Sequence, residues 1–281
     1  MLKGLMGMVV AAGVMAAGST GAAPLGKGPV PLVVLGDSLS DIGNAGRFSD
    51  GPVWVEVLAQ RLGSKLVAST RGGNNHAVGG ARIHGGAHSL RVQADRYLDG
   101  LGPDGKVPAN ALLVVYGGGN DLLAAPWAPN RATLVPDAVA TLRGILEDLA
   151  KRGATNVLVP NLPDIGLAPQ VRGFGPQVAA IANALTESYN AALARMLDGV
   201  ESRHPGMRVH RLDVHALARE VMADPAKAGF RDVSGACPDR RSCVGYLFWD
   251  GLHPTSAAHA KLAEAALRTI PGAADRVSSA R

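Results

Sequence analysis

The chain has 281 residues, of which 47% are hydrophobic, 18% charged and 4% aromatic, with 36 glycines and 18 prolines. This length and hydrophobicity suit one large α/β domain and exclude a disordered chain. The glycines follow no G-X-Y period and no segment recurs along the chain, which excludes a collagen, a solenoid or a propeller. The formal charge of +5 comes from scattered single residues. Because no basic block is present, we expect no nucleic-acid partner.

The N-terminal segment has the pattern of a secretory signal peptide. Lys3 is followed by an apolar run over residues 5–17, and small residues come after it. This run is shorter than the ~20 residues that a membrane span needs, so a cleaved signal is favoured over an anchor. We therefore predict a signal peptide over residues 1–23 and a single domain over residues 24–281. The mature protein is expected to be secreted or periplasmic.

Patterns of strands and helices alternate along the rest of the chain. Short apolar runs bounded by Pro or Gly predict buried strands, and apolar residues at helical spacing predict helices. Such alternation indicates a parallel sheet covered by helices on both faces. Ligands of such sheets bind beyond the carboxyl ends of the strands, so functional residues are expected in the loops that follow strands. The predicted strands cover residues 31–35, 65–68, 111–116, 156–159 and 207–212, and the predicted helices cover residues 53–62, 89–98, 132–151, 178–197 and 255–270.

The first predicted strand leads directly into a polar loop that contains Ser38. Small or polar neighbours, Gly36 and Asp37, allow the chain to turn sharply before this serine. Ser38 then lies at the carboxyl edge of the sheet, where a nucleophile could meet a ligand. The alternative is an ordinary loop in which Ser38 caps a helix.

Two glycine-rich loops follow later in the chain. Gly79 and Gly80 could point a backbone N–H group at a ligand, as an oxyanion hole requires. The next predicted strand, residues 111–116, ends in three glycines followed by Asn120. A dinucleotide-binding loop is excluded because Leu122 stands where that motif needs its last glycine. A purely structural turn is the alternative for this loop.

A pair of polar residues lies near the C-terminus. Asp250 precedes His253 by three residues, so its carboxylate could accept a hydrogen bond from the imidazole Nδ1–H. That contact would leave Nε2 free as a general base. The alternative is a lone surface histidine in front of a helix. Together with Ser38 and the glycine loops, the pair supplies the parts of a serine hydrolase, although the G-x-S-x-G elbow of α/β-hydrolases is absent.

Two cysteines, Cys237 and Cys243, are separated by only five residues. In an exported protein, such a pair predicts a local disulfide. A zinc site would need further ligands of matching spacing, and none stand nearby.

The chain resembles the GDSL, or SGNH, esterases and lipases, and within them the secreted bacterial branch of lecithinases and hemolysins. The resemblance spans residues 36–254, nearly the whole predicted mature chain. It rests on four sequence blocks that appear in the family's order: Gly36-Asp37-Ser38-Leu39-Ser40-Asp41, Ala77-Val78-Gly79-Gly80-Ala81, Gly117-Gly118-Gly119-Asn120-Asp121 and Asp250-Gly251-Leu252-His253-Pro254.

The resemblance implies a three-layer flavodoxin-like fold, with a central parallel sheet of about five strands. It implies a Ser-His-Asp triad in which Ser38 is the nucleophile, His253 the general base and Asp250 its orienting group. The oxyanion would be held by the Ser38 and Gly80 backbone N–H groups and by the Asn120 side-chain amide. The expected reaction is hydrolysis of carboxylic esters through an acyl-enzyme.

Some expectations are left open at this stage. Gly79 is the neighbouring candidate for the backbone donor, and Asp37 and Asp121 are expected to hold loops rather than touch substrate. Acyl transfer from a phospholipid to an alcohol, and a non-catalytic exported binding protein, are the alternative functions. We expect a monomer that needs no cofactor and no metal, acts on a small-molecule or lipid ester, and makes transient contact with lipid surfaces. The aromatic candidates for an acyl pocket, each of which could instead be core, are Phe48, Trp54, Trp127 and Phe174.

Overall fold

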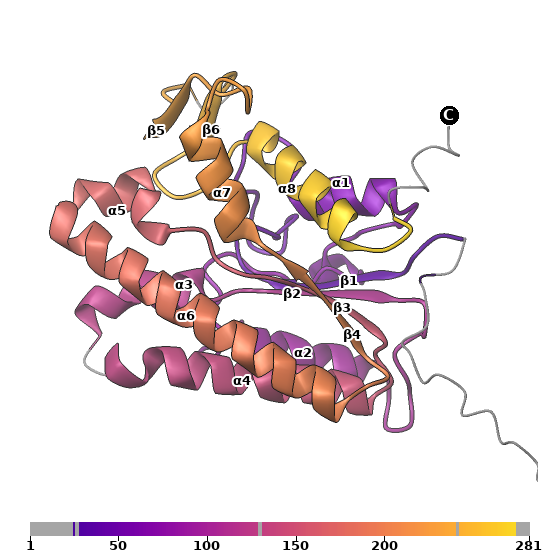
Figure 1. Cartoon of the computed structure of the whole chain (residues 1–281). Helices are drawn as coiled ribbons and strands as arrows, with labels where there is room; N and C mark the ends of the chain where they lie inside the picture. The colour runs from indigo at the N-terminus through magenta and orange to yellow at the C-terminus, as the bar shows by residue number, and fades with distance from the viewer. Residues whose placement is uncertain (1–24, 26–27, 129–130, 240–241, 274–281) are drawn as a thin grey trace, which may run out of the picture.

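The computed structural model describes Leu25 and residues 28–128, 131–239 and 242–273, so the predicted signal peptide lies outside the described residues. Its centre is a sheet of four parallel strands in the order β1-β2-β3-β4 (Figure 1). Nearly every residue of these strands is buried, as a parallel sheet covered on both faces requires. The strands are β1 (Leu32–Gly36), β2 (Leu112–Tyr116), β3 (Asn156–Pro160) and β4 (Arg208–Leu212).

Helices form a layer on each face of this sheet, which confirms the predicted three-layer α/β fold (Figure 1). One layer holds α2 (Leu90–Gly100), α4 (Arg131–Lys151) and α6 (Pro176–Arg203), and the other holds α1 (Trp54–Arg61), α7 (Val214–Ala223) and α8 (Ser256–Thr269). The remaining elements are α3 (Gly119–Ala124), α5 (Pro169–Gly173), three single 3₁₀ turns η1 (Ser69–Arg71), η2 (Ala125–Trp127) and η3 (Ile165–Leu167), and a small sheet of β5 (Asp232–Ala236) and β6 (Tyr246–Phe248).

The predicted strand over residues 65–68 is wrong, and the sheet has four strands rather than five. A later segment takes the place beside β1: His76 donates to the Val34 carbonyl and Val78 to the Gly36 carbonyl. Within this segment Asn75 forms two isolated parallel bridges, one with Val34 and one with Ala68, which is too little for a strand. The reason lies in Asn74, whose side chain bonds the carbonyls of Leu32 and Lys65 and so holds residues 65–68 one position away from the edge of β1.

Five helices or strands were not predicted: three lie between β4 and the last helix, and two lie within the loops that follow β2 and β3. Helix α7 carries a signal that could have revealed it, because the Asp213 side chain accepts a hydrogen bond from Ala216 N–H as an N-cap does. Strands β5 and β6 are short and largely exposed, so they show neither an apolar run nor a clear alternation. Helices α3 and α5 are single short turns within the loops that follow β2 and β3.

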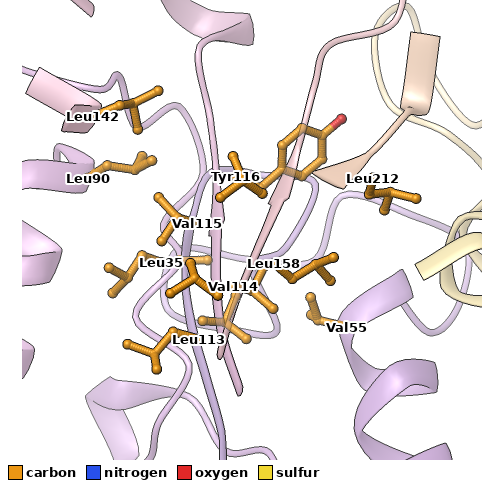
Figure 2. Packing of buried hydrophobic residues seen from close by; sticks show 14 of the residues in the cluster. Leu35, Val55, Leu90, Leu113, Val114, Val115, Tyr116, Leu142, Leu158 and Leu212 are labelled. Atoms are coloured by element: carbon orange, nitrogen blue, oxygen red, sulfur yellow. The ribbon is translucent and has the colours of Figure 1, made fainter. Parts of the chain in front are cut away.

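The core consists of aliphatic side chains packed between the sheet and both helix layers. Figure 2 shows Leu35, Val114 and Leu158 on neighbouring strands, with Leu90 and Leu142 of the helices α2 and α4 on one side. All of these side chains are at most 2% exposed. The tight core fixes the strand ends, and therefore the loops that follow them, in one arrangement.

Cys237 and Cys243 are joined by a disulfide bond in the structure, as their spacing predicts. The bond links the end of β5 to the segment that leads into β6. Since β6 ends just before Asp250, the disulfide restrains the chain that carries the last sequence block.

A buried hydrogen bond anchors the loop after β1. The indole N–H of Trp54 donates to the Ser40 hydroxyl over 3.0 Å, and both side chains are fully buried. Ser40→Ala should therefore leave a buried donor unpaired and cost roughly 1–3 kcal/mol of unfolding free energy. Thermal unfolding should show a melting temperature lower by several degrees. The exposed Ser202→Ala is the matched control, and equal melting temperatures for both variants would contradict this role of Ser40.

Candidate active site

The four sequence blocks meet at the carboxyl edge of the sheet. Ser38 follows β1 by two residues, and Asn120 lies in the first turn of α3, directly after β2. The loop from Gly79 to Ala81 continues the segment beside β1, while His253 lies between β6 and α8. In Figure 1 the carboxyl ends of the strands point towards the side of the molecule that holds α3 and α5.

A continuous hydrogen-bond chain joins the three predicted catalytic residues. The Ser38 hydroxyl lies 2.9 Å from His253 Nε2, and His253 Nδ1 lies 2.8 Å from Asp250 Oδ2. An ionised carboxylate can only accept, so Nδ1 carries the proton and Nε2 is left as an acceptor. This arrangement allows Nε2 to take the proton of Ser38 when its hydroxyl attacks an electrophile.

Asp250 is held as an anion by its own turn. Its Oδ1 accepts the backbone N–H groups of Leu252 and His253 over 2.8 and 2.7 Å. Partial burial raises the pKa of Asp250, but the hydrogen bonds from the His253 side chain and these two N–H groups lower it more, to about 2. The carboxylate therefore stays charged far into the acid range and can orient the imidazole there.

A glutamine that the sequence analysis missed holds the end of β1. The Gln93 side chain on α2 accepts the Gly36 N–H and donates to the Gly36 carbonyl, both over 2.8 Å. Gln93 is 2% exposed, so these bonds are shielded from water. In the sequence, the only signal for Gln93 was a polar residue among the apolar positions of a predicted helix. Its effect is to fix the backbone just before Ser38.

Two buried aspartates hold backbone N–H groups near the site. The Asp37 carboxylate accepts the Leu39 N–H over 3.0 Å. Burial raises the pKa of Asp37 to about 6, although the hydrogen bond from Leu39 and the nearby His253 lower it. Asp121 accepts the Ile83 N–H over 3.0 Å, and burial raises its pKa as well. The Asp121 contact joins two segments that are far apart in the chain, whereas the Asp37 contact lies within the loop after β1, and Asp37 also lines the pocket beside Ser38.

Asp41 settles which glycine N–H is available in the second block. Its carboxylate accepts the Gly79 N–H over 2.8 Å, so this donor is occupied. A side chain at Gly79 would also collide with the Phe48 ring, 2.4 Å from an added Cβ. Gly80 has a φ of +76°, which favours glycine, and its N–H has no acceptor among the described residues. The geometry therefore favours Gly80 over Gly79 as the backbone donor.

The Asn120 side chain is oriented by one of its two amide hydrogens. It donates to the Ala81 carbonyl over 3.0 Å, which leaves the second amide hydrogen for a ligand. Asn120 lines the same pocket as Ser38 and His253. The backbone N–H of Ser38 also has no acceptor among the described residues. Three donors, from Ser38, Gly80 and Asn120, are thus free to meet a negative oxygen.

An apolar pocket with a volume of about 200 Å³ opens beside Ser38 and His253. Its walls come from η3, α7, β6 and α8, which no single sequence segment reveals. Aliphatic side chains make up most of the lining, and carboxylates and a lysine contribute a few polar groups. The lining includes Leu39, Leu123, Leu162, Ile165, Leu217, Ala218, Val221, Met222, Phe230, Leu247 and Leu262.

The four aromatic residues predicted as pocket candidates do not line this pocket. Trp54 is fully buried in the core, and Phe48 packs against the His253 ring with centroids 5.1 Å apart. Trp127 and Phe174 are exposed on the surface. Aliphatic residues of α7 and α8 line the pocket instead of these aromatic residues, because those helices pack across the strand ends.

His259 is a buried histidine that also lines the pocket. Burial, and then the neighbouring His253, lowers its pKa to about 3, so the ring is neutral. Neither ring nitrogen has a partner among the described residues. A neutral ring adds no charge to the apolar wall.

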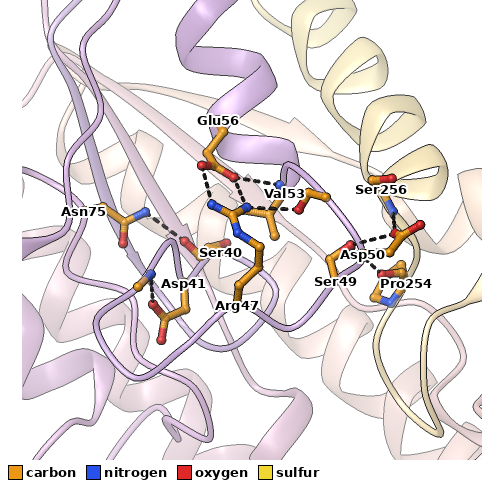
Figure 3. A network of polar contacts seen from close by, with 12 residues as sticks. Ser40, Asp41, Arg47, Ser49, Asp50, Val53, Glu56, Asn75, Pro254 and Ser256 are labelled. Atoms are coloured by element: carbon orange, nitrogen blue, oxygen red, sulfur yellow. Dashed lines mark hydrogen bonds and ion pairs between the residues drawn. The ribbon is translucent and has the colours of Figure 1, made fainter. Parts of the chain in front are cut away.

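Figure 3 shows how the loop after β1 is tied to its surroundings. The Asn75 side chain donates to the Ser40 carbonyl, and Arg47 forms an ion pair with Glu56 on α1. The Ser49 hydroxyl donates to the Pro254 carbonyl over 3.1 Å. The last contact connects the loop that carries Ser38 with the residue next to His253, although they are far apart in sequence.

No group of three or more His, Cys, Asp or Glu residues in the described part of the chain could hold a metal ion. The absence of a metal requirement stays a prediction, which a chelator added to an activity assay would test. No helix among the described residues is long and apolar enough to cross a membrane.

The chain belongs to the family of GDSL-like lipases and acylhydrolases, a class of ester-hydrolysing enzymes, since the family model matches residues 32–266. This confirms the family expected from the four sequence blocks. Lipase 1 of Photorhabdus luminescens is 26% identical, over 81% of this chain and 48% of that protein. The chain therefore spans about half the length of that relative.

Two further likenesses are to an acyltransferase and to the fold of an esterase. The phosphatidylcholine-sterol acyltransferase of Aeromonas hydrophila is 26% identical, over 85% of this chain and 89% of that protein. The structure is similar to Axe2, an acetylxylan esterase from Geobacillus stearothermophilus, with a TM-score of 0.53 and 17% identity over 90% of this chain and 96% of that one. At this identity the second likeness shows the fold alone.

Proposed function

We propose that the protein hydrolyses carboxylic esters with apolar acyl groups through a covalent acyl-enzyme on Ser38. The observation that carries this proposal is the unbroken chain from the Ser38 hydroxyl to His253 Nε2 and from His253 Nδ1 to Asp250. The apolar pocket beside it and the membership of a lipase and acylhydrolase family support the choice of substrate.

The reaction follows from this geometry. His253 Nε2 removes the Ser38 proton as the hydroxyl oxygen attacks the ester carbonyl, and Asp250 stabilises the imidazolium that forms. The oxyanion is held by the backbone N–H groups of Ser38 and Gly80 and by the Asn120 amide. His253 then protonates the leaving alcohol. Water then attacks the acyl carbonyl and gives a proton to His253, and His253 returns this proton to the Ser38 oxygen as the acid leaves.

Asn120→Ala should lower kcat by roughly 10²–10³, because one oxyanion donor is lost while binding of the neutral ester changes little. Steady-state kinetics on a soluble p-nitrophenyl ester measures this effect, with the melting temperature checked in parallel. A loss of less than about threefold in a folded variant would remove Asn120 from the oxyanion hole.

The pocket predicts that longer acyl chains react better until it is filled. Each buried methylene contributes up to ~0.8 kcal/mol, so kcat/KM should rise by at most a few-fold per methylene. Ala218→Phe puts a ring into the pocket and should lower kcat/KM for long esters by tenfold or more relative to acetate. A series of p-nitrophenyl esters from acetate to palmitate measures the profile.

Ala216→Phe is the matched control for the pocket variant. Ala216 is on the same helix, α7, but it is exposed and does not line the pocket. Its ester profile should equal that of the unchanged protein. If the profile shifts equally in both variants, a general disturbance of α7, rather than the pocket volume, controls the preference for acyl-chain length.

Acyl transfer remains a second candidate function, because the relative from Aeromonas hydrophila is named an acyltransferase. An alcohol can resolve the acyl-enzyme at the same atoms as water. A phospholipid assay with a sterol or a simple alcohol present distinguishes the two. Formation of the new ester at the expense of free fatty acid would favour transfer.

We also propose that residues 1–23 direct export and are removed, and that residues 24–281 form one domain that acts as a monomer. The charge and apolar run at the start of the sequence support the first statement. Mass spectrometry of the protein recovered outside the cytoplasm tests it, since an intact N-terminus would contradict cleavage. Light scattering of the mature chain tests the monomer.

A further inference from the structure

Two exposed aromatic side chains contact one another near the active-site edge of the sheet. Trp127 in η2 is 63% exposed and Phe174 after α5 is 52% exposed, with ring centroids 5.2 Å apart and nearly perpendicular. Ile181 on the neighbouring helix α6 is 38% exposed. Large apolar side chains that cluster in water indicate a surface that meets an apolar partner.

A groove with a volume of about 970 Å³ runs between α4 and α6 behind these residues. Aliphatic side chains form its floor, among them Val135, Val139, Leu185 and Met196. Its lining includes no carboxylate and four arginines, Arg131, Arg143, Arg195 and Arg203.

The groove is positively charged along its rim. Arg203 forms an ion pair with Glu147 over 2.8 Å. Arg131, Arg143 and Arg195 are exposed and have no carboxylate partner in the part of the chain that the structure describes. Their charges are therefore available to an anion.

From these features we infer that the face formed by Trp127, Phe174, Ile181 and the groove between α4 and α6 binds the surface of a bilayer that contains anionic phospholipid. Arginines pair with phosphate groups, and aromatic side chains favour the boundary between head groups and acyl chains. The apolar floor suits acyl carbons. A nucleic acid or an acidic soluble protein would leave that floor and the aromatic pair without an apolar partner.

The aromatic pair lies close to the catalytic edge along the chain, because η2 follows α3, the helix that carries Asn120. Docking on this face would bring a lipid ester towards Ser38.

The inference rests on the proposed function, because membrane binding would serve to bring a lipid ester to Ser38. Membrane binding must therefore be measured separately from ester hydrolysis. The test uses the mature chain with Ser38→Ala, which leaves lipid intact. Vesicles of phosphatidylcholine alone, and of phosphatidylcholine mixed with phosphatidylglycerol, are sedimented with the protein. We expect stronger binding to the mixed vesicles, and weaker binding as salt is added.

Two double variants separate the charged and apolar parts of the face. Arg143→Gln with Arg195→Gln should lower binding to mixed vesicles about thirtyfold, since each basic residue near the surface contributes ~1 kcal/mol. Trp127→Ala with Phe174→Ala should lower binding to both vesicles roughly tenfold or more. Arg61→Gln with Lys65→Gln, exposed positions on α1 and the loop after it, is the control and should change binding less than twofold.

Several outcomes would overturn the inference. These are no binding to mixed vesicles, an equal loss in the control variant, or binding of a soluble anionic lipid without any binding to vesicles. A second assay separates membrane binding from ester hydrolysis. It measures hydrolysis of p-nitrophenyl acetate by the same variants with Ser38 intact. Unchanged hydrolysis without vesicle binding contradicts only this inference, whereas vesicle binding without any hydrolysis contradicts only the proposed function.

Discussion

Ser38→Ala should reduce kcat on a p-nitrophenyl ester by roughly 10⁶, because the covalent pathway is lost and only the oxyanion donors and substrate binding still accelerate hydrolysis. The hydroxyl removed is the one that lies 2.9 Å from His253 Nε2. The backbone N–H of residue 38 and the pocket are unchanged, so esters should still bind. Burst and steady-state kinetics on the short-chain ester measure the loss.

The variant Ser40→Ala is the matched comparison within the same loop. Its hydroxyl accepts a hydrogen bond from the Trp54 indole N–H, whereas His253 Nε2 is bonded to Ser38, so this variant should lose stability while its folded fraction keeps its turnover. A fluorophosphonate probe should label the unchanged protein at Ser38 and leave the Ser38→Ala variant unlabelled. Absence of labelling in the folded, unchanged protein would instead support a non-catalytic binding protein.

Asp250→Asn should lower kcat by roughly 10⁴ at neutral pH, because an amide can favour the wrong imidazole tautomer and cannot stabilise the imidazolium. The asparagine oxygen can still accept the N–H groups of Leu252 and His253, so the turn should persist. The pKa of Asp250 is lowered to about 2, so in the unchanged protein this carboxylate remains charged down to that range. Any loss of activity at mildly acidic pH must therefore arise from another group.

Asp232→Asn provides the control for the turn itself. Asp232 accepts the N–H groups of Ser234 and Gly235, both over 2.8 Å, in the same spacing that Asp250 uses. It is not connected to a histidine, so its variant should keep kcat within about twofold. Similar losses in both variants would show that the turn, rather than the contact with His253, sets the rate.

Much of the candidate site was predictable because its residues follow strands directly. Ser38 and Asn120 come after buried apolar runs, and such runs reveal strands from local pattern alone. Parallel strands bring their carboxyl ends to one edge, so residues from distant blocks must meet there. The contact between His253 and Asp250 spans only three residues and is equally local.

Gln93 and the strand over residues 65–68 show where local pattern fails. Gln93 is a polar residue on a helix, and only the packing of α2 against β1 shows that it bonds Gly36. Residues 65–68 are apolar enough for a strand, yet the Asn74 side chain holds them one position away from β1. In both cases a side chain from elsewhere decides the outcome.

By itself, the sequence determined the family, the α/β alternation, the order of the four sequence blocks and the pairing of Cys237 with Cys243. Each of these depends on residues that are close together in the chain or on strand ends that must converge. Only the tertiary structure decided that Gly80 rather than Gly79 has a free N–H, and that aliphatic residues of α7 and α8 form the pocket. It also decided that Trp127 and Phe174 lie exposed beside a basic groove. These features depend on which helices pack across which strand ends, and contacts between residues so far apart in the chain leave no periodic pattern in the sequence.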